Sequence, residues 1–272
     1  MSESSVSAKV EELREAVRRR RAILFVGGGA SVGLGLPSWQ GLIAHIGEEL
    51  GPDVDGFAQP GSNYLTLAEY YRIKKGAIGP LRSWMDVQWS AGDEEIRNSR
   101  LHHLIIELDF PLIYTTNYDR NIERAYELAG KPFAKIVDVR DLPEVDLEAT
   151  QIVKFHGDFD DDASIVLTET DYYDRLSFES PLDLKLRADA LARPILFIGY
   201  SLSDINIRLL LHKLWRTWDA SGHPQNRPKS FIFMHQPDPI QEAVLGQWDI
   251  EVVSNEADDP GTALCEFLES LK

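Results

Sequence analysis

Two polar side chains suited to an active site stand directly after apolar segments of this sequence. Asn117 lies in TTNYD, which follows the apolar residues 112–114, and His156 lies in HGD, which follows QIVKF. The amide of an asparagine both donates and accepts hydrogen bonds, so it can hold a hydroxyl group or a water molecule in one orientation. A neutral imidazole near pH 7 can accept a proton from such a hydroxyl or water. The pair therefore indicates general-base chemistry on an oxygen atom.

These residues also have purely structural explanations. Thr116 or Asn117 could cap a helix that starts near Tyr118, because such side chains accept hydrogen bonds from the first free amides of a helix. Asp119 would then be a first-turn acid favoured by the helix dipole. His156 could be a hydrogen-bonded histidine at the end of a strand. The residue types alone leave both explanations open.

A glycine-rich stretch, GGGAS at residues 27–31, lies between an expected strand and an expected helix. Glycines allow a tight turn and the close approach of a diphosphate, whose charge the amides at a helix start can bind. The match to the dinucleotide-binding fingerprint is partial. Ala30 stands where the middle glycine of the window 28–33 is expected, and no acidic residue ends a clear second strand. A tight turn without a ligand is the alternative.

Four apolar segments end in a polar or glycine-rich cluster, at residues 27–31, 115–119, 156–158 and 199–204. Ligands of an open parallel sheet bind in the crevice at the carboxyl ends of its strands. If the four segments are parallel strands, their clusters converge on one crevice. This convergence is a stronger signal than any one of the motifs.

The elements that position these clusters alternate between strands and helices. Apolar runs without alternation suit strands buried on both faces, and apolar residues at helical spacing suit helices between them. This order favours an α/β fold with a Rossmann-like, doubly wound parallel sheet. Residues 42–101 show no clear strand and are interpreted as a helical insertion, or small lobe, within a single domain of residues 1–272. The expected strands are residues 22–26, 112–114, 134–138, 151–155, 164–167, 194–198, 230–234 and 250–253, and the expected helices include 6–20, 118–129, 205–218 and 263–271.

The composition excludes several classes of function. The 272 residues carry a net charge of −16, which would repel a phosphate backbone, so direct nucleic-acid binding is not expected. The single cysteine, Cys265, can form neither a disulfide framework nor a four-cysteine zinc site, and no metal-ligand spacing is present. No apolar run approaches the ~20 residues that span a bilayer, and the first residues lack the apolar core of a signal peptide. A reducing cytoplasm is the expected compartment.

The four clusters, in this order, resemble the sirtuin (silent information regulator) superfamily. GGGAS with the following GLP at residues 35–37 is similar to the family's GAGxS…GIP loop, and TTNYD is similar to its TQNxD element. FHG at residues 155–157 resembles the strand that carries the family histidine, and GYSLSD resembles its GTSL motif. The resemblance covers roughly residues 20–255. It implies a Rossmann-like fold that binds NAD and breaks the bond between nicotinamide and ribose.

This sequence differs from ordinary sirtuin deacylases at several positions, and the differences indicate which branch of the superfamily it resembles. The four-cysteine zinc ribbon is absent, the family's Asp-Phe-Arg after GIP is Ser38-Trp39-Gln40, and the glutamine before the asparagine is Thr116. The pattern is closer to bacterial sirtuin-like NADases of anti-phage defence, which keep the asparagine and histidine without the zinc module. Many of those act as oligomers or with a partner protein, such as an Argonaute-like protein or a DNA-translocase-type ATPase.

The resemblance implies an NAD+ hydrolase that uses NAD+ as substrate and needs no metal. Asn117 and His156 are its expected catalytic residues. Two other function classes stay open, namely a non-catalytic module that senses NAD or ADP-ribose and a zinc-free protein deacylase or ADP-ribosyltransferase. The expected NAD-binding residues are Gly27, Gly28, Gly29, Ser31, Pro37, Trp39, Thr116, Asp119, Gly199, Tyr200 and Ser201.

Overall fold

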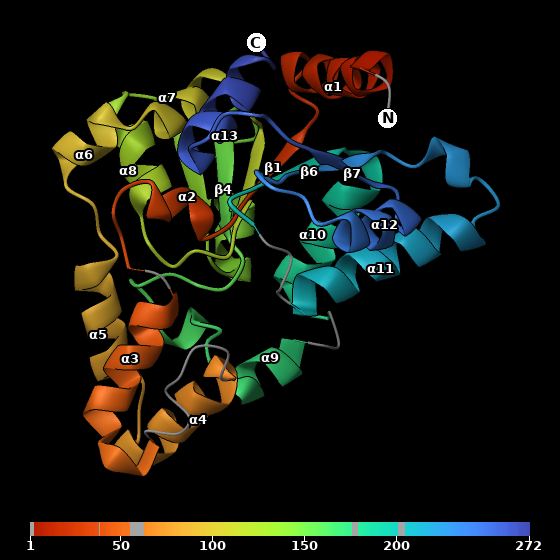
Figure 1. Ribbon diagram of the computed structural model, residues 1–272. Coiled ribbons are helices and arrows are strands. Elements are labelled where there is room, and N and C mark those ends of the chain that lie inside the picture. The colour runs from red at the N-terminus through yellow and green to blue at the C-terminus, as the bar shows by residue number, and fades with distance from the viewer. Residues whose placement is uncertain (1–2, 38, 55–62, 176–178, 201–204) are drawn as a thin grey trace.

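A single sheet of seven parallel strands forms the centre of the molecule (Figure 1). The computed structural model describes residues 3–37, 39–54, 63–175, 179–200 and 205–272. The strand order β3-β4-β2-β1-β5-β6-β7 confirms the predicted α/β, Rossmann-like class. The strands are β1 (Ile23–Val26), β2 (Leu112–Thr115), β3 (Phe133–Ile136), β4 (Thr150–Lys154), β5 (Ile195–Ile198), β6 (Ser230–Phe233) and β7 (Ile250–Val253).

The central strands are buried along their whole length, as their continuous apolar sequences predict. Successive side chains of each strand point to opposite faces of the sheet, so each face needs its own covering layer. Leu24 and Val26 of β1 face one layer, and Ile23 and Phe25 face the other. The layers are built from helices that connect the parallel strands.

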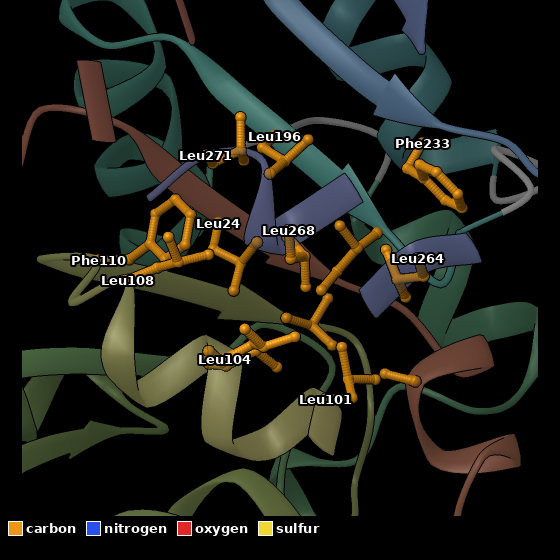
Figure 2. Packing of buried hydrophobic residues seen from close by; sticks show 14 of the residues in the cluster. Leu24, Leu101, Leu104, Leu108, Phe110, Leu196, Phe233, Leu264, Leu268 and Leu271 are labelled. Carbon is orange, nitrogen blue, oxygen red and sulfur yellow. The ribbon is translucent and has the colours of Figure 1, made fainter. Parts of the chain in front are cut away.

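The first layer contains α1 (Glu3–Arg18), α7 (Arg100–Glu107), α8 (Asn121–Leu128) and α13 (Pro260–Glu269). Figure 2 shows this core, to which Leu24 of β1, Leu101 and Leu104 of α7, and Leu264 and Leu268 of α13 all contribute. The second layer contains α10 (Pro181–Ala192), α11 (Ile205–Ala220) and α12 (Pro239–Gln247). Helices thus cover both faces, as in a doubly wound fold.

A third cluster of buried side chains lies apart from the sheet and belongs mainly to α3 (Trp39–Leu50), α4 (Tyr64–Lys75) and α5 (Gly79–Gln88). Tyr118, Phe159, Ile165 and Leu167 complete it from segments that follow β2 and β4. Helix α7 begins at the end of the predicted insertion 42–101 and packs against the sheet. The domain limits 1–272 and 42–101 stay predictions.

The remaining elements are α2 (Gly29–Val32), η1 (Pro52–Val54), α6 (Asp93–Asn98), η2 (Val139–Glu144), η3 (Asp162–Ser164), α9 (Glu169–Arg175) and η4 (Pro224–Asn226).

Two predicted elements differ from the structure. Residues 164–167 were expected as a strand, but η3 ends at Ser164 and the next three residues have no regular structure. They are apolar because Ile165 and Leu167 pack into the third cluster. The helix expected over residues 118–129 starts only at Asn121. Within the described part of the chain, no helix has the length and apolar character to cross a membrane.

Candidate active site

The carboxyl end of β1 is where the connections of the sheet change direction. Strand β1 pairs with β2 on one side and with β5 on the other, and this reversal marks the usual ligand crevice of a doubly wound sheet. The glycine-rich loop follows β1 at this point, and Gly199 follows β5. The amide of Gly27 donates to the carbonyl of Ile198 at 2.9 Å, and the amide of Gly29 donates to that of Gly199 at 2.8 Å.

These two loops touch so closely that Gly27, Gly29 and Gly199 have no room for side chains. A Cβ atom on Gly27 would lie 2.5 Å from the Gly199 carbonyl oxygen and 2.1 Å from Cδ2 of Tyr200. Gly199 has a φ of +60°, which also favours glycine. The amides of Ala30 and Ser31 donate to carbonyls within the same loop, at 3.1 and 3.0 Å. A diphosphate held by these amides would have to replace hydrogen bonds that the loop now makes to the chain itself.

Helix α2, which follows this loop, is shorter than the sequence suggests. It contains only the four residues 29–32, and a turn separates it from α3. The macrodipole of so short a helix adds little to anion binding. A diphosphate bound here would therefore interact mainly with the shape and the individual amides of the glycine loop, and less with the dipole of a helix N-terminus.

Asn117 does not cap a helix. Helix α8 begins at Asn121, with Arg120 at the capping position, so the capping alternative for Thr116 or Asn117 is wrong. The Nδ2 atom of Asn117 instead donates to the Gly27 carbonyl and to Ser31 Oγ, both at 3.2 Å. With Nδ2 engaged in this way, Oδ1 is the atom of the amide that remains to accept a hydrogen bond.

Thr115 anchors the backbone of this loop. Its Oγ1 donates to the Val26 carbonyl at 2.9 Å and accepts from the Asn117 amide at 3.0 Å. The last residue of β2 thereby joins the end of β1 to the start of the Asn117 loop. The position of Asn117 is fixed from both its backbone and its side chain.

Asp119 connects the same loop to Ser31. Its Oδ2 accepts from Ser31 Oγ at 2.9 Å, and its Oδ1 accepts from the Asn121 amide at 3.1 Å. Burial raises the pKa of Asp119, although the charge of Lys154 and these hydrogen bonds oppose the rise. Asp119 precedes α8, so the explanation as a first-turn acid is wrong. Its bond to Ser31 makes Asp119 a link between two strand ends.

His156 comes to the same edge of the sheet through the register of β2 and β4. Thr115 is paired with Lys154, so Asn117 and His156 each stand two residues beyond paired positions. The residue is only 2% exposed, and its ring packs at 5.4 Å and nearly perpendicular to the ring of Tyr172. The hydrogen bonds that join Ser31, Asn117 and Asp119 do not include His156. The structure therefore places His156 at the same carboxyl edge of the sheet as Asn117, but buried beneath the protein surface.

A cavity of about 290 Å³ opens beside this buried histidine. Phe155 and Gly157, the two neighbours of His156, contribute to its wall, together with Arg175 and the start of α10. This cavity lies at the ends of β3 and β4, away from the contact between the Gly27 and Gly199 loops.

The other predicted binding residues are placed less tightly. Tyr200 packs its ring against Phe25 at 5.7 Å, and Pro37 and Thr116 are half-buried. Trp39 starts α3, but its side chain is outside the described part of the structure, as is the whole of Ser201. In the described residues, no group of three histidine, cysteine or acidic side chains is arranged to hold a metal.

The sequence analysis missed the charged residues beneath these loops. Lys154 is completely buried, with Glu123 and Asp158 close to its ammonium group. A lysine inside the apolar run QIVKF was the available signal, because a strand buried on both faces has no solvent for a charge.

Comparison with known proteins agrees with this geometry. Residues 111–253, just over half of the chain, match the family model of the SIR2-like domain. The chain belongs to the SIR2-like domain family. This membership confirms the resemblance carried by the four strand-end motifs.

Several curated relatives extend the comparison beyond the family model. The chain is 30% identical over 210 residues to the NAD(+) hydrolase ThsA of Enterococcus faecium, which covers 74% of the chain and 41% of the relative. It is 28% identical over 207 residues to ThsA of Bacillus cereus (strain MSX-D12), covering 75% of the chain and 42% of that protein. It is also 28% identical over 254 residues to defense-associated sirtuin 2 of Bacillus subtilis, covering 90% of the chain but 24% of the relative. The chain thus spans less than half the length of these relatives.

Proposed function

We propose that this SIR2-like chain hydrolyses NAD+ at the bond between nicotinamide and ribose, releasing nicotinamide and ADP-ribose. The observation that carries the proposal is the clamped amide of Asn117, held by the Gly27 carbonyl and Ser31 Oγ at the point where the sheet connections reverse. The relatives named NAD(+) hydrolase support the same substrate.

Asn117 would orient the reacting oxygen. Its Oδ1 can accept from a ribose hydroxyl or from the attacking water, while Gly27 and Ser31 hold its Nδ2. Asp119, through Ser31, keeps this arrangement in place. Gly27, Gly28, Gly29 and Ser31 would contact the diphosphate, Gly199, Tyr200 and Ser201 the adenosine ribose, and Pro37, Trp39 and Thr116 the rest of NAD+.

His156 would act as the general base that deprotonates the ribose hydroxyl or the water. The transition state at the anomeric carbon resembles an oxocarbenium ion, as in other glycoside cleavage. The nicotinamide ring is cationic in NAD+ and leaves neutral, so no strong general acid is required. Because His156 is 2% exposed, the residues that cover it must shift when NAD+ binds.

The burial of His156 also favours a second candidate, a module that binds NAD+ or ADP-ribose without cleaving it. A histidine that never reaches the ligand would have a structural role, to which its ring contact with Tyr172 contributes. Saturable NAD+ binding without release of nicotinamide would support this second candidate.

The test is incubation of the purified chain with NAD+, with nicotinamide and ADP-ribose followed by chromatography. We expect Asn117→Ala and His156→Ala each to lower turnover by ~10²–10⁴-fold. Because His156 is buried, its truncation leaves a cavity, and thermal unfolding checks that this variant is still folded in the assay. Asn98→Ala and His223→Ala, which alter exposed residues of the same types, are the matched controls. Full turnover in both site variants would overturn the assignment. Transfer of ADP-ribose to a protein, or cleavage that requires acyl-lysine, would instead indicate a transferase or deacylase.

We further propose that this activity depletes NAD+ in anti-phage defence and is regulated by assembly, either as a homo-oligomer or with a partner such as an Argonaute-like protein or a DNA-translocase-type ATPase. The relative named defense-associated sirtuin 2 supports the defence role. Co-purification from the native host, followed by light scattering, tests the assembly. A monomer with no bound protein and full activity would contradict it.

A further inference from the structure

Lys154 is the last residue of β4 and is completely buried. Removing an ammonium group from water is costly unless charged and polar partners surround it. Lysine is also the one charged residue in the otherwise uncharged strand sequence TQIVK. The contacts of Lys154 must therefore offset the free-energy cost of burying its ammonium group.

The ammonium group contacts three segments at once. It donates a hydrogen bond to the backbone carbonyl of Asp119, in the loop after β2. It lies 3.2 Å from Oε1 of Glu123 on α8 and 3.6 Å from Oδ2 of Asp158, in the loop after β4. One side chain therefore joins the loop that carries Asn117 to the loop that carries His156.

The carboxylates around Lys154 depend on its charge. Asp158 has no exposed side-chain surface and Glu123 has 5%. Burial raises the pKa of Glu123, and the attraction of Lys154 is the main effect that opposes it. Lys135 on β3 adds a second ammonium, 3.5 Å from Asp158, but its other partner is Asp160 and not the Asn117 loop.

A continuous path of contacts leads from Lys154 to the clamped amide. Lys154 holds the backbone of Asp119, the Asp119 carboxylate accepts from Ser31, and Ser31 accepts from Asn117. On the other side, Asp158 stands two residues after His156. We propose that Lys154 is a positioning residue that fixes the loops of Asn117 and His156 relative to each other for NAD+ cleavage. This inference rests on the proposed function of the same site.

If Lys154 served only to balance buried charge, its replacement would lower stability without a separate effect on turnover. The variants must therefore separate charge balance from positioning. Lys154→Met alone leaves buried carboxylates without their ammonium and is expected to be strongly destabilised. The double variant Lys154→Met/Glu123→Gln removes one positive and one negative charge, so it keeps the net charge of the cluster. It still lacks the hydrogen bond to the Asp119 carbonyl. Lys135→Met is the matched control, because it removes an ammonium from Asp158 without touching the Asn117 loop.

The experiment compares NAD+ turnover, KM and thermal unfolding of these full-length variants with those of the unsubstituted chain. We expect the double variant to recover most of the thermal stability lost in Lys154→Met. Its kcat should remain ~10–100-fold low, with KM changed by less than about threefold. Lys135→Met should retain kcat within about threefold. A double variant with normal kcat would overturn the inference and leave Lys154 as a structural charge.

Hydrogen exchange tests the positioning without reference to activity. In the double variant, we expect faster amide exchange in residues 116–121 and 156–160 and unchanged exchange in residues 22–26. Unchanged exchange in both loops would overturn the inference. If the unsubstituted chain does not cleave NAD+, the proposed function fails by itself, and hydrogen exchange still decides whether Lys154 fixes the loops.

Discussion

Gly27 is the residue at which the loops after β1 and β5 meet most closely. A Cβ atom there would come within 2.5 Å of the Gly199 carbonyl oxygen, a backbone atom that can move only with its loop. We expect Gly27→Ala to separate the two loops and to lower the free energy of unfolding by about 1–3 kcal/mol. NAD+ turnover should fall by at least ~10-fold, because Gly27 also accepts from Asn117. Urea unfolding and chromatography of nicotinamide measure the two effects.

Gly33→Ala is the matched control for this change. Gly33 is exposed and has a φ of −62°. Among the described residues, a Cβ atom there would have the Ala30 carbonyl oxygen as its nearest contact, at 3.8 Å. Its stability should therefore stay within about 0.5 kcal/mol of the original. Equal losses in the two variants would show that the contact with Gly199 is not what requires glycine at position 27.

The sequence predicted where the site residues lie but not how they contact each other. Ser31, Asn117 and His156 could be assigned to one edge because each follows an apolar strand, and parallel strands end at the same edge. The bond from Asn117 to Ser31 depends on side-chain orientation, which strand order alone does not determine. Lys154 was missed because two of its three partners, Asp119 and Glu123, come from segments that follow β2, and the sequence does not show that these lie beside the end of β4.

Helices α4 and α9 are joined by the carboxylate of Glu69. It accepts from the Thr170 amide at 2.9 Å and from Arg72 at 2.7 Å. Burial acts to raise the pKa of Glu69, but these hydrogen bonds outweigh it and lower the pKa to about 2. The ionised group therefore stabilises the fold above the unfolded-state pKa. This stabilisation is lost as the pH falls from about 4.5 toward 2.

We expect Glu69→Gln to lower the free energy of unfolding by about 1 kcal/mol at pH 7. The difference from the original chain should shrink below about pH 4.5, because the unfolded chain takes up a proton at this carboxylate while the folded chain keeps it ionised. Urea titrations at pH 7, 4 and 3 measure it. Glu48→Gln, which changes an exposed carboxylate of α3, is the control. A loss at pH 7 no larger than that of the control would show that Glu69 does not stabilise the junction of α4 and α9.

Strands were easier to predict than the segments that follow them. The apolar run of β1 needs only burial on both faces, which its own sequence reveals. Tyr118 looked like the start of a helix. It is instead held outside α8, because its hydroxyl donates to the Val166 carbonyl at 2.7 Å and its ring stacks on Trp89. Those contacts come from the third cluster, and tertiary contacts of this kind override local propensity.

The order of the strands is a property of the whole molecule that the sequence could not supply. Ile23 of β1 pairs with Leu112 on one side and with Ile195 on the other, so its neighbours come from distant parts of the chain. Apolar runs identify strands that are buried on both faces but do not say which run lies beside which. The four polar clusters place a ligand at the carboxyl edge of the sheet, but they do not determine the order of the strands.

The stability of the whole molecule should depend on pH through His102. This histidine is a buried residue of α7 with 3% of its surface exposed, and its Nδ1 is 2.8 Å from Ser99 Oγ. Burial, with a smaller effect from the nearby His103, lowers the pKa of His102 to about 4. The unfolded chain therefore takes up a proton near pH 6.5, where the folded chain does not. Stability is fully present above pH 6.5 and falls as the pH drops toward 4, by about 3 kcal/mol at most.

His102→Gln tests this dependence, because glutamine can still bond to Ser99 but carries no titrating proton. At pH 7 we expect its free energy of unfolding to stay within about 1.5 kcal/mol of the original. Between pH 6.5 and 4 the original chain should lose stability faster than the variant, so the two curves approach each other or cross. Urea unfolding at pH 7, 5.5 and 4.5 gives both curves. Parallel curves would mean that His102 is protonated as easily in the folded chain as in the unfolded chain, and that its burial does not lower its pKa.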